Sequence, residues 1–164
     1  MPAVWRGRSL AGASRREARL ALPEPTEGDD IVADYRSVGL TLKRHPLALL
    51  RRKLDKLRVT RSAELTQLNT GRKVRVAGII THRQRPETAS GVVFMSLEDE
   101  TGVSNLIVWP RVQTEQRQAV FASSMIVVQG ELQHEMGVVH VIAHKVRDYS
   151  AWLGRLTMRS RDFR

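Results

Sequence analysis

Three consecutive carboxylates, Glu98-Asp99-Glu100, are the residues of this sequence whose types and spacing could do chemistry. Enzymes that join or cut nucleic acid hold catalytic metal ions with clustered carboxylates, which must converge on the same ions. Neighbouring residues of a strand instead point to opposite faces. The run LEDETG also has the composition of a tight turn, in which Asp99 can hydrogen-bond to the backbone of the turn. We therefore predict a turn between two strands here and no catalytic site.

The remaining residue types point to no metal centre. His140 and His144 share a predicted strand, but four strand residues separate them by about 13 Å, too far for one ion. The chain has no cysteine, which excludes disulfides and thiolate metal sites and fits a reducing compartment. We predict no metal site, no cofactor in this chain and no small-molecule substrate.

Positive charge dominates the sequence and is unevenly placed. The net charge is +10, and the segment from residue 43 to residue 61 supplies +7 of it, because eight basic residues there face one acid, Asp55. Such a stretch attracts a polyanion through counterion release. The alternative is the solvated face of a helix. The eight basic residues are Lys43, Arg44, Arg51, Arg52, Lys53, Lys56, Arg58 and Arg61.

The first seventy residues divide into a tail and a helical connector. Residues 1–35 lack periodicity and end in an acidic, proline-containing run, which is typical of a flexible tail and linker. Residues 36–70 form a connector in which Pro46 can begin a helix. Four leucines (47, 50, 54 and 57) form one apolar stripe of that helix. We expect its remaining surface to carry the basic residues Arg51, Arg52, Lys53 and Lys56. A second short helix over residues 63–68 can be capped by Thr60 or Ser62.

From Arg72 the pattern becomes strand-like. Alternating and β-branched stretches predict five strands, at residues 72–85, 92–99, 103–109, 125–133 and 138–148. Pro110 stops the third strand and can begin a helix over residues 110–122. This order predicts a mainly β chain: a five-stranded Greek-key barrel of the OB-fold type, with one helix between strands three and four and a short basic helical segment before it. The barrel would span residues 71–150, and residues 151–164 would form a C-terminal tail.

OB-folds bind nucleic-acid strands across the second and third strands, between the loops that follow strands one and four. Phe94 and Trp109 lie on the outward faces of these strands and could stack on bases, although either ring could instead belong to the core. The other candidates are basic residues, whose side chains can bind phosphate. The alternative for those in the loop is an exposed charged loop without a ligand. The basic candidates are Arg83 and Arg85 in the first loop, Arg75 on strand one, Lys145 on strand five and Arg111.

One long run, VRVAGIITHRQRPETASGVVFMSLEDETGVSNLIVWP, resembles the OB domain near the C-terminus of bacterial error-prone DNA polymerases of the C family, relatives of the DNA polymerase III alpha subunit. The run DYRSVGLTLKRHPLALLR is similar to the helical connection before that domain, and RSRDFR resembles the family's ending. The resemblance covers roughly residues 23–164. Its specificity lies in the combination of RQRP, LEDETG, the Trp109-Pro110 pair and the ending, all in order.

The resemblance implies translesion DNA synthesis in the DNA-damage response for the intact proteins, which use Mg²⁺ in a domain without a counterpart here. It implies that this chain is a C-terminal fragment that lacks the polymerase active site and is not an enzyme by itself. We expect it to contact single-stranded or primer-template DNA, to meet other damage-response proteins, and to reside in a bacterial cytoplasm away from membranes. Two alternatives stay open: a protein-docking module without DNA binding, and an RNA-binding OB domain.

Overall fold

The computed structural model describes residues 44–162, with side chains described as far as Leu156. The predicted tail and linker over residues 1–35, and the connector up to residue 43, lie outside the described residues.

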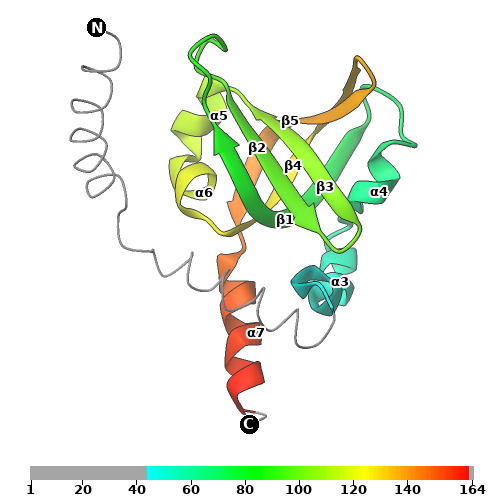
Figure 1. Cartoon of the computed structure of the whole chain (residues 1–164), viewed down its shortest axis with the longest axis vertical. Coiled ribbons are helices and arrows are strands. Elements are labelled where there is room, and N and C mark those ends of the chain that lie inside the picture. The colour runs from blue at the N-terminus through cyan, green and yellow to red at the C-terminus, as the bar shows by residue number, and fades with distance from the viewer. Residues whose placement is uncertain (1–43, 163–164) are drawn as a thin grey trace, which may run out of the picture.

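Five strands form a closed barrel in the neighbour order β1-β2-β3-β5-β4 (Figure 1). All neighbours pair in antiparallel fashion except β3 and β5, which are parallel. This topology with helices between β3 and β4 is the predicted OB-fold, so the predicted fold class is confirmed. The strands are β1 (Lys73–Gln84), β2 (Val93–Asp99), β3 (Gly102–Val108), β4 (Met125–Glu135) and β5 (Val138–Asp148).

The alternating pattern of the sequence produces the barrel interior. Along β2, Val93, Met95 and Leu97 are buried, while the residues between them are partly exposed. Leu106 of β3 and Val128 of β4 join the same core. Because the strand period is two, every second side chain enters the barrel and the others form its outer surface.

The connection between β3 and β4 contains two short helices where we expected one. Helices α5 (Pro110–Glu115) and α6 (Arg117–Ala122) meet at Gln116, whose φ of −131° and ψ of 42° interrupt the helix. The Gln116 side chain accepts a hydrogen bond from the Val146 backbone and donates one to the His144 carbonyl, so it ties this junction to β5. Pro110 begins α5 as predicted.

A β-bulge interrupts the regular pairing of β4 with β5. Gln129 pairs with Lys145 and Gly130 pairs with Ala143, so His144 is left without a partner in the ladder. His144 and Lys145 are consequently both exposed, although they are neighbours. Gly130 permits this geometry, because a Cβ there would lie 2.2 Å from the Ile142 carbonyl oxygen.

A second core lies outside the barrel. Helix α3 (Pro46–Lys56) buries Leu47, Leu50 and Leu54 on one face, as the leucine spacing predicted. These side chains pack in one cluster with barrel residues such as Ile79 and Met125. The short helix α4 (Ser62–Leu65) follows, and its N-cap is Arg61, not Thr60 or Ser62. The Ser62 hydroxyl is unavailable for capping because it faces the β2–β3 turn.

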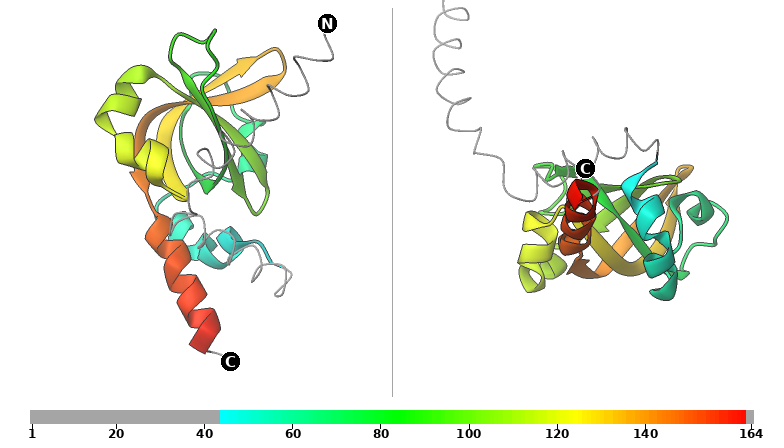
Figure 2. Two further views of the ribbon diagram at one scale, coloured as in Figure 1. Left: turned by 60° about the vertical axis from the view of Figure 1, so that its left-hand side comes forward. Right: turned by 90° about the horizontal axis from the view of Figure 1, so that it is seen from below.

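The segment after the barrel is helical, whereas we expected residues 151–164 to be a tail. Helix α7 (Ser150–Asp162) follows β5 directly and projects from the same end of the barrel at which α3 lies (Figure 2). Leu153 is fully buried in the second core, and Trp152 packs against that core. The Ser150 amide donates to Asp148 Oδ1 at 2.8 Å, which caps the helix start. None of the described helices is long and apolar enough to cross a membrane.

Candidate nucleic-acid interface

The three carboxylates at the β2–β3 turn are structural, as predicted for Asp99. Its Oδ1 accepts hydrogen bonds from the Thr101 amide at 2.7 Å, the Thr101 hydroxyl at 2.7 Å and the Gly102 amide at 3.0 Å. These bonds close the turn. Within residues 44–162, no group of three or more histidine or carboxylate side chains is placed to hold a metal ion.

The second oxygen of Asp99 connects the turn to helix α4. Oδ2 accepts hydrogen bonds from the Ser62 amide and the Ser62 hydroxyl, both at 2.8 Å. Burial by itself would raise the pKa of Asp99, but the hydrogen bonds from Ser62 and Thr101 outweigh burial and hold that pKa below its usual range. Asp99 is therefore an ionised, buried anchor between the barrel and α4.

The neighbouring acids hold helix α3, which corrects our prediction for Arg51. We expected Arg51 on a solvated basic surface, yet only 8% of it is exposed. Its Nη2 donates to Glu100 Oε2 at 2.8 Å, and its Nε donates to the other Glu100 oxygen. Burial alone would lower the pKa of Arg51, but the contacts with Glu100 and Asp99 raise it. Glu98 contributes a further hydrogen bond, in which Glu98 Oε1 lies 3.1 Å from His45 Nε2.

The outer face of β2 and β3 carries a shallow hollow beside Phe94. Ser96 of β2 and Asn105 of β3 line it with the half-buried Phe94 ring. His82 and Gln84 of β1 and His140 of β5 complete the polar lining, and sequence reasoning missed all three. Barrel closure brings His140 beside Asn105, and an irregularity in β1 between Ile80 and His82 re-aims the end of that strand. We name this surface the β2–β3 face.

Trp109 lies immediately after β3 and is 51% exposed, so it is not a core residue. It is the N-cap residue of α5, and its side chain makes no capping hydrogen bond. The ring therefore offers a solvent-accessible aromatic surface at the end of β3.

Arg83 and Arg85, both predicted in the first loop, are held by contacts within the chain, and Arg83 lies in β1 and not in the loop. Arg83 Nε donates to the Val120 carbonyl at 2.8 Å and its Nη2 donates to the Ser123 carbonyl, which fastens the end of α6 to β1. Arg85 donates to the Gln113 side chain, and its guanidinium carbon lies 5.8 Å from the Phe121 ring centroid. These contacts position both side chains toward α5 and α6.

The remaining candidates do not gather on the β2–β3 face. Arg75 lies on the opposite part of β1, where its Nη1 donates to the Leu57 carbonyl. Lys145 is exposed on β5 near Arg75. Arg111 is fully exposed and pairs with Glu115, with 3.0 Å between Arg111 Nε and Glu115 Oε1, and this pairing raises its pKa. Of the predicted basic helix surface, the exposed residues are Arg52, Lys53 and Lys56.

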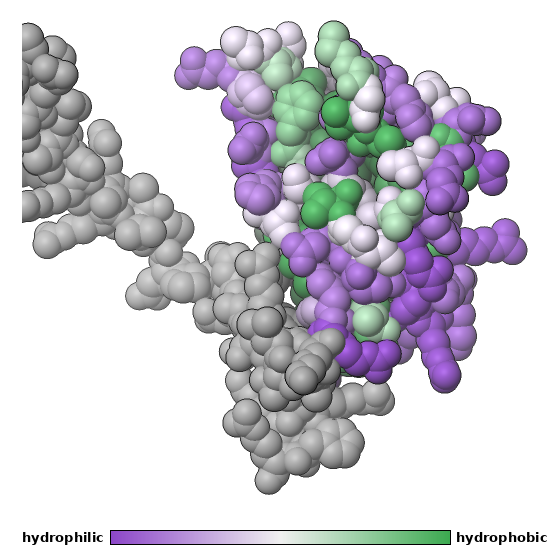
Figure 3. All heavy atoms as spheres, turned by 45° about the vertical axis from the view of Figure 1, so that its right-hand side comes forward, coloured by the Kyte–Doolittle hydropathy of each residue, from purple (hydrophilic) through white to green (hydrophobic). Residues whose placement is uncertain are grey.

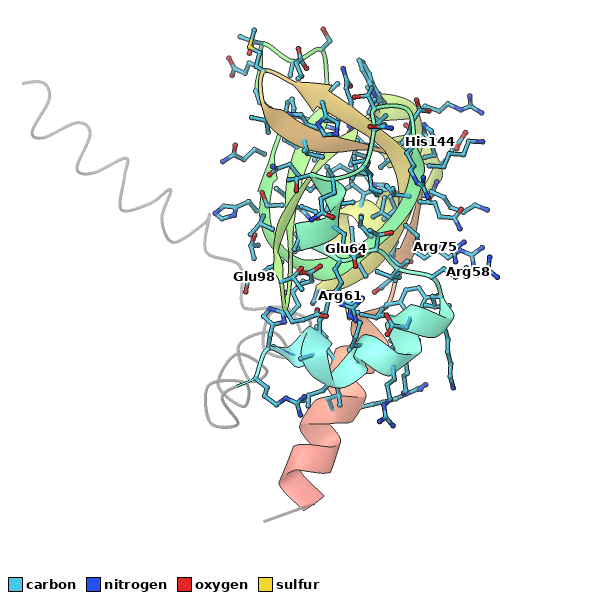
Figure 4. All side chains as sticks on the ribbon, turned by 90° about the vertical axis from the view of Figure 1, so that its right-hand side faces the viewer. Arg58, Arg61, Glu64, Arg75, Glu98 and His144 are labelled. Carbon is cyan, nitrogen blue, oxygen red and sulfur yellow. The ribbon has the colours of Figure 1, made fainter. Side chains whose placement is uncertain are left out.

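Figure 4 shows how some of these charged side chains are distributed around the barrel. Arg58 and Arg75 lie near each other on one side of the molecule, with His144 further along that side, whereas Glu98 lies on the other. Arg58 and Arg75 thus lie on a different side of the barrel from Glu98 of β2.

Comparison with known proteins agrees with this architecture. Residues 74–149 match a family model described as an OB-fold nucleic acid binding domain. The chain is also 47% identical over 161 residues to the error-prone DNA polymerase of Dechloromonas aromatica (strain RCB), covering 98% of this chain and 16% of that protein. The error-prone DNA polymerase of Alkalilimnicola ehrlichii is 48% identical over 147 residues, covering 90% of this chain and 14% of that protein.

This chain therefore contains an OB-fold domain, and its resemblance to error-prone DNA polymerases is confirmed over nearly its whole length. It spans 16% and 14% of the lengths of those two relatives. Among solved structures, asparaginyl-tRNA synthetase from Pyrococcus horikoshii is similar with a TM-score of 0.46 and 23% identity, covering 56% of this chain and 22% of that one.

Proposed function

We propose that the chain binds single-stranded DNA across the β2–β3 face. The observation that carries this proposal is the half-buried Phe94 ring in a hollow whose other side chains, such as Asn105 and His82, can hydrogen-bond to bases. Every base offers an aromatic face, so stacking on such a ring tolerates any sequence. Trp109 at the end of β3 would extend the stacking surface.

We further propose that the chain acts within translesion synthesis by an error-prone DNA polymerase, as the similarity to such polymerases suggests. In that role it contributes strand contact and not nucleotidyl transfer. The Mg²⁺-dependent chemistry would belong to a part of the polymerase to which this chain does not correspond. Primer-template DNA, other damage-response proteins and a bacterial cytoplasmic location belong to the same proposal.

Fluorescence anisotropy of a labelled oligodeoxythymidine tests strand binding directly. Phe94→Ala should weaken binding by about tenfold, because stacking on one aromatic contributes roughly 1–3 kcal/mol. Phe121→Ala is the matched control, since it removes an exposed phenyl ring of α6 that is not among the residues lining the hollow. Equal affinity of the Phe94→Ala and Phe121→Ala proteins would contradict the proposal.

A protein-docking function is the second candidate, and one observation favours it. The residues that line the hollow on the β2–β3 face include no lysine or arginine. Strand binding normally combines stacking with a positively charged path for the phosphates. Absence of oligodeoxythymidine binding by the unmodified protein at low salt would favour docking, and preference for an RNA stem-loop would favour the RNA-binding alternative.

A further inference from the structure

Within residues 44–162, six cationic side chains that take part in no ion pair lie over β1, β5 and the segments beside them, away from the β2–β3 face. Two adjoining hollows occur there and share Arg75 and Gln129 in their walls. The first lies between α4 and the barrel, and the second lies between the end of α3 and β5. We call the two together the basic groove. Its cationic residues are Arg58, Arg72, Lys73, Arg75, Lys145 and Arg147.

Strand geometry places these cations outward on neighbouring strands. Lys73 and Arg75 alternate with the buried Val74 and Val76 on β1, so both point away from the core. Lys145 and Arg147 are spaced in the same way on β5. Gln129 of β4 pairs with Arg75 on one side and with Lys145 on the other. The cations of β1 and those of β5 are therefore separated by the single strand β4.

The Gly130 bulge widens the charged surface. A regular ladder would turn one residue of the pair at positions 144 and 145 into the barrel, but the bulge exposes both. His144 therefore joins the wall of the first hollow while Lys145 lines the second. The side chain of Arg75 is fixed between them, donating to the Leu57 carbonyl and lying against the Gln129 amide.

Few acids oppose these cations. Among the residues that the structure describes, Glu64 is the one acidic residue in the walls of the two hollows. Glu131 lies opposite Lys73 in the β1–β4 register. The ion pairs found among residues 44–162 involve none of the six cations, and those that are exposed keep their charge available to a ligand. In Figure 3, hydrophilic side chains project densely along the right-hand side of the visible surface.

We propose that the basic groove binds the phosphate backbone of duplex nucleic acid. The first hollow has arginine, lysine and hydrogen-bonding side chains such as Thr60 and Gln67, but no phenyl or indole ring on which a base could stack. Contacts of this composition position a backbone without reading bases. The second hollow is lined by one aromatic residue, Tyr149, whose ring packs edge-to-face with the Trp152 ring at a centroid distance of 4.8 Å.

This inference is separate from strand binding on the β2–β3 face. The lining of the β2–β3 face has the Phe94 ring and no lysine or arginine, whereas the lining of the first hollow of the basic groove has cations and no phenyl or indole ring. A molecule with both surfaces occupied would hold a single strand and a duplex at once. The expected ligand is therefore a junction between the two.

A blunt-ended, labelled DNA hairpin, titrated by anisotropy at several salt concentrations, tests the groove with the full chain. The double variant Lys73→Gln and Lys145→Gln should bind the hairpin about tenfold more weakly. The plot of log affinity against log salt concentration should also become less steep, its slope decreasing in magnitude by about 1.8, since each phosphate contact contributes about 0.9. Both lysines are exposed, so the fold should persist, and circular dichroism checks this.

The control removes two exposed charges elsewhere, with Arg117→Gln on α6 and Arg155→Gln on α7. It should leave hairpin binding within about twofold of the unmodified protein, because these side chains lie outside the groove. An equal loss in the control, unchanged hairpin binding in the lysine variant, or no hairpin binding by the unmodified protein would overturn the proposal. So would an equal loss of oligodeoxythymidine binding in the lysine variant. Phe94→Ala should weaken the oligodeoxythymidine and spare the hairpin, so strand binding and the groove can fail independently.

Discussion

Asp99 uses both of its carboxylate oxygens, one for its own turn and one for helix α4. Oδ1 receives three hydrogen bonds from Thr101 and Gly102, and Oδ2 receives two from Ser62. Hydrogen bonds to a buried charged group contribute more than those between neutral groups. This residue joins the barrel to the helical segment, and no substrate is needed to explain its burial.

Replacing Asp99 should reveal this role through stability. Asp99→Asn should lower the free energy of unfolding at pH 7 by about 3 kcal/mol, because an amide nitrogen would face the Ser62 or Thr101 donors. Urea denaturation measures the change. Glu87→Gln, in the exposed loop after β1, is the control and should change stability by less than about 0.5 kcal/mol.

The unmodified protein and Asp99→Asn also show how the contribution of Asp99 to stability depends on pH. The folded-state pKa of Asp99 lies below its ordinary value of 3.8, so its contribution is fully present above that value. The contribution is lost as the pH falls through the folded pKa. The stability gap between the unmodified protein and Asp99→Asn should therefore narrow at acidic pH, and a gap that widens would contradict the assignment.

At the scale of elements, the bulge at Gly130 is the feature that shapes the basic groove. Gly130→Ala would place a Cβ 2.2 Å from the Ile142 carbonyl oxygen, which the β4–β5 ladder cannot accommodate without moving. We expect a loss of stability of more than about 2 kcal/mol, measured as a lowered urea midpoint. Gly137→Ala in the β4–β5 turn is the comparison. Its φ is 77° with no neighbour within 4 Å, so it should cost only about 1 kcal/mol.

The elements themselves were largely predictable, because their signals are local. Period two placed Val93, Met95 and Leu97 inside the barrel, and the leucine spacing placed one side of α3 against it. Pro110 marked the start of α5. Helix α7 was missed because Leu153 is buried by contacts with a distant element and not by a pattern in its own segment.

The candidate site was less predictable, for a physical reason. Arg51 and Glu100 are separated by 49 residues, and nothing in a basic run shows that one arginine turns inward. Closure of the barrel brings Asn105 and His140 together through parallel pairing, which no local pattern encodes. The placement of Phe94 and Trp109 outside the core was predictable, because both residues follow the alternation of β2 and β3 and its continuation past Val108.

At the scale of the whole molecule, two surfaces differ in chemistry. The β2–β3 face offers the Phe94 ring and hydrogen-bonding side chains, and the basic groove offers cations on β1 and β5. The acidic turn and the second core fix helices α3 and α4 to the barrel, so Arg58 at the end of α3 stays beside Arg75 (Figure 4). Helix docking is thus what completes the groove.

Backbone amide chemical shifts of the isotope-labelled chain, recorded during titration with oligodeoxythymidine, test strand binding on the β2–β3 face most directly. We expect the largest chemical-shift changes on residues 93–96 of β2 and on residues 105–109 at the end of β3. Residues 72–75 and 144–147, in the basic groove, should change little with the single strand. Changes confined to helix α3 or to the groove would contradict the assignment of strand binding to the β2–β3 face.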